Sequence, residues 1–308
     1  MATPDLTAID LHHAGVPEMI AAHALDLGDG TFALVDPGPG ATLPRLEAGL
    51  AELGLELDAL GAILVSHVHL DHAGAAGALA GRSGATVYAH PRAAIHLADP
   101  SRLLASATRV YGDLMDALWG PMEPVPEAQL RVAEDGEAFV LGRHRVHALA
   151  APGHAGHQHA WLLGDGRAFP GDAASIRLPG QDVIMPATAP PEIDLEAWPR
   201  TLDALAAARL DALHLPHFGV RGGPAGGGAD AVLEHLERVR TALQAWTDVA
   251  RAGIAAGEDD AALAARLERF LRAELAAAGV PAEGADRAIR AAIPRMCAVG
   301  LRRALRRA

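Results

Sequence analysis

The sequence of 308 residues predicts a mixed α+β fold followed by an all-helical C-terminal region. Residues 6–220 alternate short apolar strand patterns with turn residues and a few helical segments. From Ala229 onward the pattern is helical throughout, and the stretch GGPAGGG over 222–228 separates the two regions as a flexible linker. We therefore predict a first domain over residues 1–222 and a helical subdomain over residues 229–308.

The individual elements follow from periodicity and turn chemistry. Strands are expected over Met19–Leu27 and Thr31–Val35, because Gly28-Asp29-Gly30 between them is a hairpin turn signal. Further strands are expected over 63–65, 86–89, 139–140, 146–150, 160–163, 168–169 and 212–215. Helices are expected over 43–53, 73–80, 91–118 with a break at Asp99-Pro100, 195–208, 232–251, 259–278, and 283–307 with a break at Pro294.

The charge balance is acidic and uneven along the chain. The formal net charge is −12, and residues 1–228 hold 27 acidic residues against 13 arginines. Because nucleic-acid binding needs a basic face that displaces counterions from phosphates, this balance argues against a nucleic-acid partner. We expect a small-molecule substrate and no membrane partner, with a homodimer left open.

Cysteine content and terminal patterns favour a cytoplasmic location. Cys297 is the single cysteine, which excludes an internal disulfide and a cysteine-built zinc site. We find no basic stretch followed by an apolar core at the N-terminus, and no run of about 18 apolar residues. The basic end Arg302–Arg307 could contact nucleic acid or anionic lipid, but we favour a solvated helix end there.

The strongest chemical signal is the stretch AILVSHVHLDHAGAAG over Ala62–Gly77. A buried-strand pattern ends at Ser66 and is followed by four metal-capable side chains, namely His67, His69, Asp71 and His72. The end of a strand lies at the carboxyl edge of a sheet, where α/β proteins build their sites. His67 and His69 are two residues apart, so on extended backbone their side chains face the same side. Asp71 and His72 lie beyond the strand, where the chain turns, and can face a second point. The spacing therefore suggests two adjacent metal positions.

The same event recurs further along the chain, where an apolar strand stops and a metal-capable residue follows. It occurs at His154, at Asp172 and at His217. Imidazole and carboxylate ligands suit zinc, iron or manganese, and we take zinc as the first choice. His214 competes with His217 for the last ligand role, and we favour His217 because it follows the strand.

These residues resemble the metallo-β-lactamase-fold hydrolases, whose order and spacing they match over roughly residues 15–220. The resemblance implies an αββα sandwich with a dinuclear site between two sheets. Within the superfamily the chain is most similar to the glyoxalase II-like and lactonase-like branch and to poorly characterised archaeal and bacterial members. The implied ligands of the first metal are His67, His69 and His154, those of the second are Asp71, His72 and His217, and Asp172 bridges the two.

The implied reaction is metal-dependent hydrolysis. A water on two divalent ions loses a proton near neutral pH, and the hydroxide attacks an ester, thioester or lactone carbonyl. Asp71 and Asp172 are the predicted catalytic residues, with Asp71 orienting the hydroxide proton. The alternatives are an oxidoreductase that resembles the mononuclear-iron sulfur dioxygenases, a phosphoester hydrolase or nuclease of the same fold, and a metal-stabilised binding module.

Three further positions, Asp36, His157 and His90, have two interpretations each. Asp36 either holds a ligand histidine through its ring N–H or forms a turn. His157 either supports the ligands or is an ordinary loop histidine, and His90 either reaches the site or caps a turn. His159 is expected to be structural. Tyr111, Met115 and Trp119 are expected on one helix stripe, packed in the core in preference to forming a substrate lid.

Overall fold

The computed structural model describes residues 5–223 and 226–307, which divide into two compact units. The first unit comprises Met1–Ala150 and His157–Gly171, and the second comprises Ala151–Gly156 and Asp172–Ala308. Both units are therefore discontinuous in sequence. Among the described residues, no helix combines the length and apolar content needed to cross a membrane.

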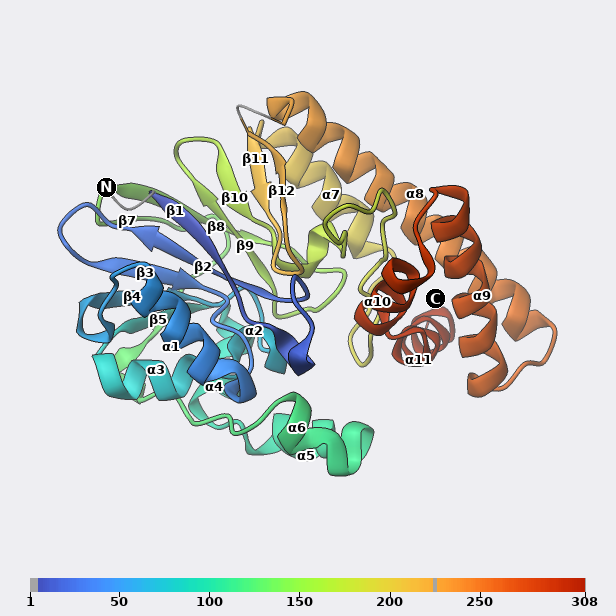
Figure 1. The fold of residues 1–308 in the computed structure, drawn as a ribbon, viewed down its shortest axis with the longest axis horizontal. Helices are drawn as coiled ribbons and strands as arrows, with labels where there is room; N and C mark the ends of the chain where they lie inside the picture. The colour runs from blue at the N-terminus through green and yellow to red at the C-terminus, as the bar shows by residue number, and fades with distance from the viewer. Residues whose placement is uncertain (1–4, 224–225, 308) are drawn as a thin grey trace. The chain divides into compact units, whose positions relative to one another are not determined.

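The first unit contains a six-stranded sheet whose strands follow one another in chain order (Figure 1). The strands are β1 (Leu6–Asp10), β2 (Ala21–Asp26), β3 (Phe32–Val35), β4 (Leu60–Leu64), β5 (Thr86–Ala89) and β6 (Leu130–Val132). Pairing is antiparallel from β1 to β3 and parallel from β3 to β6. The carboxyl ends of the parallel strands therefore lie at one edge, where open α/β sheets place their sites.

Four antiparallel strands form the second sheet of this unit, in the order β10-β9-β8-β7. They are β7 (Ala138–Leu141), β8 (His144–Ala150), β9 (His159–Leu163) and β10 (Arg167–Phe169). Side chains of both sheets share one apolar core, in which Val35 and Leu64 of the first sheet cluster with Val146 and Trp161 of the second. Burial of each such side chain contributes about 1.5–3 kcal/mol, so this core fixes the strand ends that carry polar residues.

The connections between strands β3 and β6 of the first sheet contain α-helices. They are α1 (Leu43–Glu52), α2 (Leu70–Ala73), α3 (Ala76–Ser83), α4 (Pro91–Ala98), α5 (Ser101–Tyr111) and α6 (Met115–Leu118). Helix α1 contacts β1, α3 contacts β4 and β5, and α4 contacts β6. The short 3-10 helices of the unit are η1 (His13–Gly15), η2 (Gly40–Thr42), η3 (Leu57–Ala59), η4 (Gly112–Leu114) and η5 (Glu127–Gln129).

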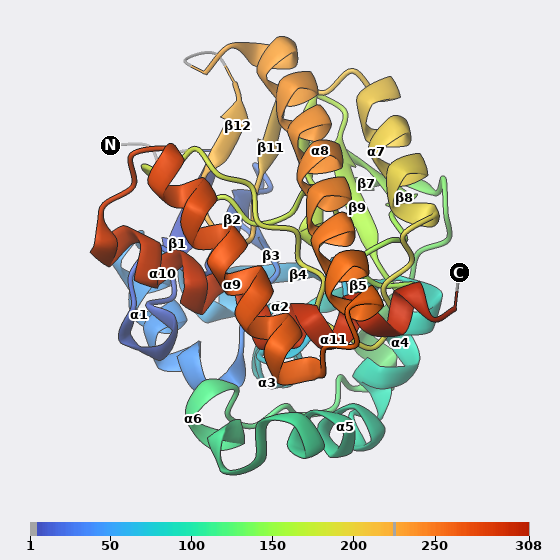
Figure 2. The same ribbon diagram turned by 90° about the vertical axis from the view of Figure 1, so that its right-hand side faces the viewer.

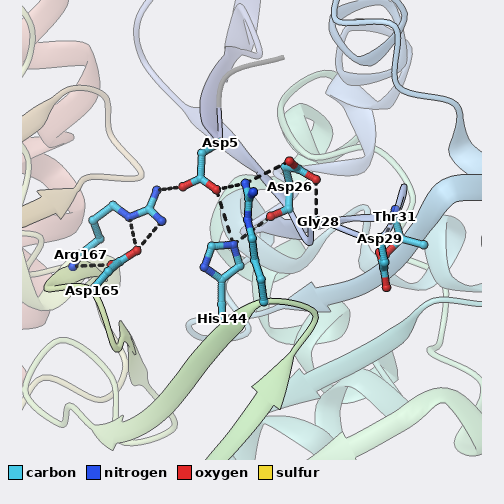
Figure 3. Close-up of polar contacts among 9 residues, drawn as sticks. Asp5, Asp26, Gly28, Asp29, Thr31, His144, Asp165 and Arg167 are labelled. Carbon is cyan, nitrogen blue, oxygen red and sulfur yellow. Dashed lines mark hydrogen bonds and ion pairs between the residues drawn. The ribbon is translucent and has the colours of Figure 1, made fainter. Parts of the chain in front are cut away.

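An ionic network ties the two sheets of the first unit together at the start of β1 (Figure 3). The Asp5 carboxylate accepts from Arg143 and, at 2.5 Å, from Arg167, which also donates to Asp165 at 2.5 Å. Arg143 reaches Asp26 at the end of β2 at 3.0 Å. These side chains are partly exposed, so each ion pair contributes at most about 1 kcal/mol.

The second unit is mainly helical (Figure 2). Its elements are α7 (Ala197–Ala207), the antiparallel strands β11 (Ala212–His214) and β12 (Val220–Gly222), α8 (Gly228–Ala255), α9 (Asp260–Ala277), α10 (Ala282–Ala292) and α11 (Pro294–Leu305), with η6 (Gly171–Ala174) at its start. Helix α8 contacts α7, α9, β11 and β12, while α11 contacts both α8 and α9. A buried leucine at every fourth position of α9, from Leu263 to Leu275, explains this packing.

The predicted α+β fold, with two sheets and a C-terminal helical region, is confirmed. The predicted break at Pro294 is also found, because Ile293 adopts a left-handed conformation between α10 and α11. Strands β1, β6 and β12 were not predicted individually, and β6 and β12 have only three residues each with little apolar pattern.

The predicted single helix stripe of Tyr111, Met115 and Trp119 is wrong. Helix α5 ends at Tyr111 because Gly112 has a φ of 54°, and Trp119 follows the end of α6. The rings of Tyr111 and Trp119 nevertheless approach each other, with centroids 5.2 Å apart. The two rings are therefore in contact although they lie at the ends of two separate helices, α5 and α6.

The predicted linker over 222–228 lies partly outside the described residues, at 224 and 225. Of the described part, Gly222 ends β12 and Gly228 begins α8. Residues from Asp172 onward belong to the same compact unit as the C-terminal helices. A separate subdomain over 229–308 stays a prediction.

Candidate metal centre

Two sets of metal-capable side chains occur in the structure, one in each unit. All seven predicted ligands are among the histidines and aspartates that could hold a metal ion. The first unit contributes His67, His69, Asp71 and His72, and the second contributes His154, Asp172 and His217.

The first set begins three residues after the end of β4 at Leu64. His67 and His72 are fully buried, and His69 occupies the position before helix α2. His67 Nε2 lies 3.0 Å from His69 Nδ1, and the rings of His67 and His72 have centroids 4.0 Å apart. Asp71 Oδ2 lies 3.6 Å from His72 Nε2. Three imidazoles and a carboxylate therefore crowd together at the carboxyl edge of the first sheet.

Asp36 supports this set from the neighbouring strand. Its carboxylate accepts from the Ser66 backbone N–H at 2.7 Å, from Ser66 Oγ at 2.7 Å and from His72 Nδ1 at 3.0 Å. Of the two interpretations of Asp36, the structure supports the one in which it holds a histidine ring, that of the predicted ligand His72. Asp36 reaches Ser66 because β3 and β4 are parallel and Val35 pairs with Leu64.

The hydrogen bonds around these rings fix their proton positions. A carboxylate only accepts, so His72 Nδ1 carries the proton and its lone pair is on Nε2. Ser66 Oγ donates its single proton to Asp36 and can only accept from His67 Nδ1, which lies 3.1 Å away. His67 Nε2 therefore also presents a lone pair. Both rings are in the tautomer that a metal bound at Nε2 requires.

The second set is arranged around Asp172, which is 4% exposed. One carboxylate oxygen lies 3.6 Å from His154 Nε2, and the other lies 3.3 Å from His217 Nε2. The Asp172 carboxylate therefore directs one oxygen toward each of two histidines. His217 follows β11, whereas His214 lies inside β11 and pairs with Val220.

Three contacts orient the loops that carry His154 and Asp172 in the second set. His154 Nδ1 donates to the carbonyl oxygen of Ala187 at 2.5 Å, so the His154 lone pair is again on Nε2. The indole N–H of Trp198, on α7, donates to the carbonyl of Ala173 at 2.9 Å, next to Asp172. Thr201, one turn later on α7, donates to the carbonyl of Pro152 at 2.6 Å. Helix α7 thus holds the loops of His154 and Asp172.

The remaining predicted histidines occupy distinct positions in the first unit. The His157 ring lies against His67 and His69, with centroid distances of 6.1 and 5.5 Å. His90 accepts from the Arg92 backbone N–H and caps α4, and burial lowers its pKa to about 4. His159 Nε2 hydrogen-bonds the Ala133 carbonyl at 2.9 Å, which supports its predicted structural role.

Sequence reasoning missed His235, which lies on α8 and is 3% exposed. Its Nε2 donates to the carbonyl of Ala174 at 2.9 Å, two residues after Asp172. Burial lowers the pKa of His235 to about 4, so the ring is neutral at physiological pH. A signal was present, because His235 lies on the apolar stripe of its helix between Val232 and Val239.

The comparison with protein families decides the assignment. A family model described as the metallo-beta-lactamase superfamily matches residues 16–217, which is more than half of the chain and includes all seven predicted ligands. The chain belongs to the metallo-beta-lactamase superfamily.

Individual relatives within the superfamily support the fold. A metallo-beta-lactamase fold-containing protein of Sulfurisphaera tokodaii is 32% identical over 149 residues, which cover 47% of this chain and 56% of that protein. The chain therefore spans little more than half of that curated relative. Its solved structure has a TM-score of 0.60 at 24% identity, covering 76% of this chain and 85% of its own.

A metallo-beta-lactamase family protein of Thermus thermophilus has a TM-score of 0.66 at 23% identity, covering 99% of this chain and 94% of its own. A metallo-beta-lactamase of Cronobacter sakazakii has a TM-score of 0.55 at 22% identity, with 82% and 98% covered. At these identities the structural relatives establish the fold and not the activity.

The donor set fits the divalent metal ions that the superfamily implies. Imidazole and carboxylate groups are ligands of such ions. In His67, His72 and His154 the contact at Nδ1 keeps the ring proton there, so the lone pair of each ring is on Nε2 and can bind a metal. These observations support divalent metal binding by the histidine and aspartate clusters.

Proposed function

We propose that this chain is a dinuclear metal-dependent hydrolase that acts on an ester, thioester or lactone carbonyl. The observation that carries the proposal is the shared tautomer of His67, His72 and His154, each held through Nδ1 so that Nε2 can bind a metal. In the proposed assignment His67, His69 and His154 hold the first ion, Asp71, His72 and His217 hold the second, and Asp172 bridges them.

The two ions, when bound, would supply an acidified water and a Lewis acid that polarises the carbonyl oxygen. The residues of the chain position this chemistry. The Asp71 carboxylate, with its side chain 21% exposed, can accept and hold a proton at Oδ2. Asp36 keeps the proton of His72 on Nδ1, and Ala187 does the same for His154. Burial of His67, His72 and His154 excludes bulk water from the ligands.

We propose a small molecule as the substrate and not a nucleic acid. The residues that precede Ala229 hold 27 acidic groups against 13 arginines, which disfavours a polyanion. The cytoplasm is the proposed location, consistent with the single buried Cys297.

The test combines metal analysis by mass spectrometry with a panel of ester, thioester and lactone substrates. We expect about two zinc ions per chain in the wild type, and hydrolysis lost in Asp172→Ala. Asp203→Ala is the control, because that carboxylate is 71% exposed on α7, where it pairs with Arg240. The control should keep both metal content and turnover.

Two results would contradict the proposal. Less than one metal per chain, in protein purified without chelators, would exclude a dinuclear site. Iron as the bound metal, together with oxygen uptake on a persulfide, would instead identify an oxidoreductase.

A further inference from the structure

The carbonyl that orients His154 belongs to an irregular segment, Ile176–Pro191, in the second unit. His154 Nδ1 donates to Ala187 O at 2.5 Å, and both residues are buried. Ile176 and Met185 form an antiparallel bridge within the segment, with two backbone hydrogen bonds of 3.0 and 2.9 Å. Beyond Met185 its backbone makes few bonds to itself, so other elements must fix the position of Ala187.

Helix α11 makes the closest approach to this part of the segment. A Cβ atom built on Gly300 would lie 1.9 Å from the carbonyl oxygen of Thr188, the residue after Ala187. Only glycine allows that approach. Cys297 lies one turn earlier on the same face of α11, with its sulfur 3.9 Å from the Pro186 carbonyl. The residues on both sides of Ala187 therefore lie against α11.

Helix α10 fixes the earlier part of the segment. Gln181 Nε2 donates to the Gly284 carbonyl at 2.8 Å, and an Arg287 guanidinium nitrogen donates to the Pro179 carbonyl at 3.1 Å. The contacts of α10 and α11 together span Pro179 to Thr188.

We propose that α10 and α11 are positioning elements for the metal ligand His154, acting through the Ala187 carbonyl. Gly300 is the central residue, because its missing side chain sets how closely α11 approaches Thr188. This inference rests on the proposed function, since it takes His154 as a ligand of the first metal. It assigns the C-terminal helices a role in metal affinity, in addition to any role around the substrate.

The consequence of adding a methyl group at Gly300 follows from the geometry. Cβ contacts below 3.0 Å essentially do not occur, so the added Cβ and Thr188 O must separate by at least about 1 Å more. Such a shift breaks the 2.5 Å bond to His154 Nδ1 or bends it beyond hydrogen-bonding geometry. Loss of an outer partner of a ligating histidine weakens metal binding by about 10–100-fold.

The experiment compares Gly300→Ala with Gly81→Ala in the full chain. Gly81 lies in helix α3, and a Cβ there would meet nothing within 4 Å, so the two changes match in helix propensity and differ in the contact. Zinc affinity is measured by chelator competition, metal content by mass spectrometry, and cobalt-substituted protein by its visible absorption spectrum. Circular dichroism checks that each variant is folded.

We expect Gly300→Ala to keep its helical spectrum, to lose affinity for one zinc ion about 10–100-fold, and to show an altered cobalt spectrum. Metal content should fall from about two to about one per chain, because only the first metal uses His154 in the proposed assignment. Gly81→Ala should behave like the wild type. If Gly300→Ala does not fold, Gln181→Ala, which removes only the bond to Gly284, should produce a smaller loss of affinity in the same direction.

Normal affinity and an unchanged cobalt spectrum in folded Gly300→Ala would overturn the inference, as would unchanged affinity in Gln181→Ala. A wild type that binds no zinc and gives no cobalt spectrum would instead refute the proposed function. The two failures are thus distinguishable in one set of measurements.

Discussion

Replacing Asp36 by asparagine should move a single proton and thereby weaken metal binding. The Asp36 oxygen Oδ2 accepts from Ser66 Oγ and from His72 Nδ1, while Oδ1 accepts from the Ser66 backbone N–H. If the amide oxygen of the introduced asparagine keeps the bond to the Ser66 N–H, its NH₂ group faces His72 Nδ1. Two donors cannot bond each other, so the His72 proton must move to Nε2, the nitrogen that the metal requires.

The magnitude follows from the bonds involved. A hydrogen bond to a charged group contributes about 1.5–3 kcal/mol, and every 1.4 kcal/mol is a factor of ten in an equilibrium constant. Asp36→Asn should therefore weaken zinc binding by about 10–100-fold, in agreement with the usual effect of changing a partner of a ligating histidine. In the alternative orientation of the asparagine amide, its NH₂ group faces the buried Ser66 N–H, which then loses its acceptor. The free-energy cost of that loss is about the same.

The assay is zinc competition with a chelator at pH 7.5, with the tautomer of His72 read from nitrogen chemical shifts of the ring. Asp29→Asn is the matched control, because Asp29 also accepts from the N–H and hydroxyl of one residue, Thr31, but is exposed and contacts no histidine. Zinc affinity within twofold of the wild type in Asp36→Asn would refute the reasoning. An equal loss in both variants would show that the effect is not local to His72.

Two further predictions concern the second unit. The pKa of His235 is about 4 in the folded chain and 6.5 in the unfolded chain. The neutral, buried ring therefore contributes about 3 kcal/mol to the free energy of unfolding. This contribution is complete above pH 6.5 and is lost as the pH falls through 4. Urea unfolding in the presence of a chelator should show a weaker fall in stability between pH 7 and 4.5 for His235→Gln, and identical slopes would contradict this. Burial raises the pKa of the Cys297 thiol from 9.0 to about 11 and lowers the thiolate fraction about a hundredfold. An aromatic disulfide reagent should therefore label the native chain at least about a hundredfold more slowly than the urea-unfolded chain. Comparable labelling rates would mean that α11 is not packed as described.

The ligand types could be predicted from sequence because the signal is local. His67, His69, Asp71 and His72 follow one apolar strand within a few positions, and no tertiary information is needed to see them. The role of Asp36 remained one of two interpretations, because it depends on the register that pairs Val35 with Leu64. Pairing register is a property of the assembled sheet and leaves little trace in either strand alone.

The supports of the second ligand set could not be predicted for a different reason. His154 and His235 both donate to backbone carbonyls, of Ala187 and Ala174, and a carbonyl acceptor has no side-chain signature. Gly300 lies in a helix with ordinary alanine-rich neighbours, so its need for close approach is visible only in three dimensions.

The discontinuous second unit imposes an order on events during synthesis of the chain. His154 leaves the ribosome roughly 150 residues before Gly300, which at 5–20 residues per second is about 7–30 s. Once His217 has been added, the chain contains every predicted ligand, but α11 does not yet exist to hold Thr188 beside Ala187. A nascent chain stalled before Pro294 should therefore bind zinc more weakly than the released protein, so that full metal loading follows completion of the chain.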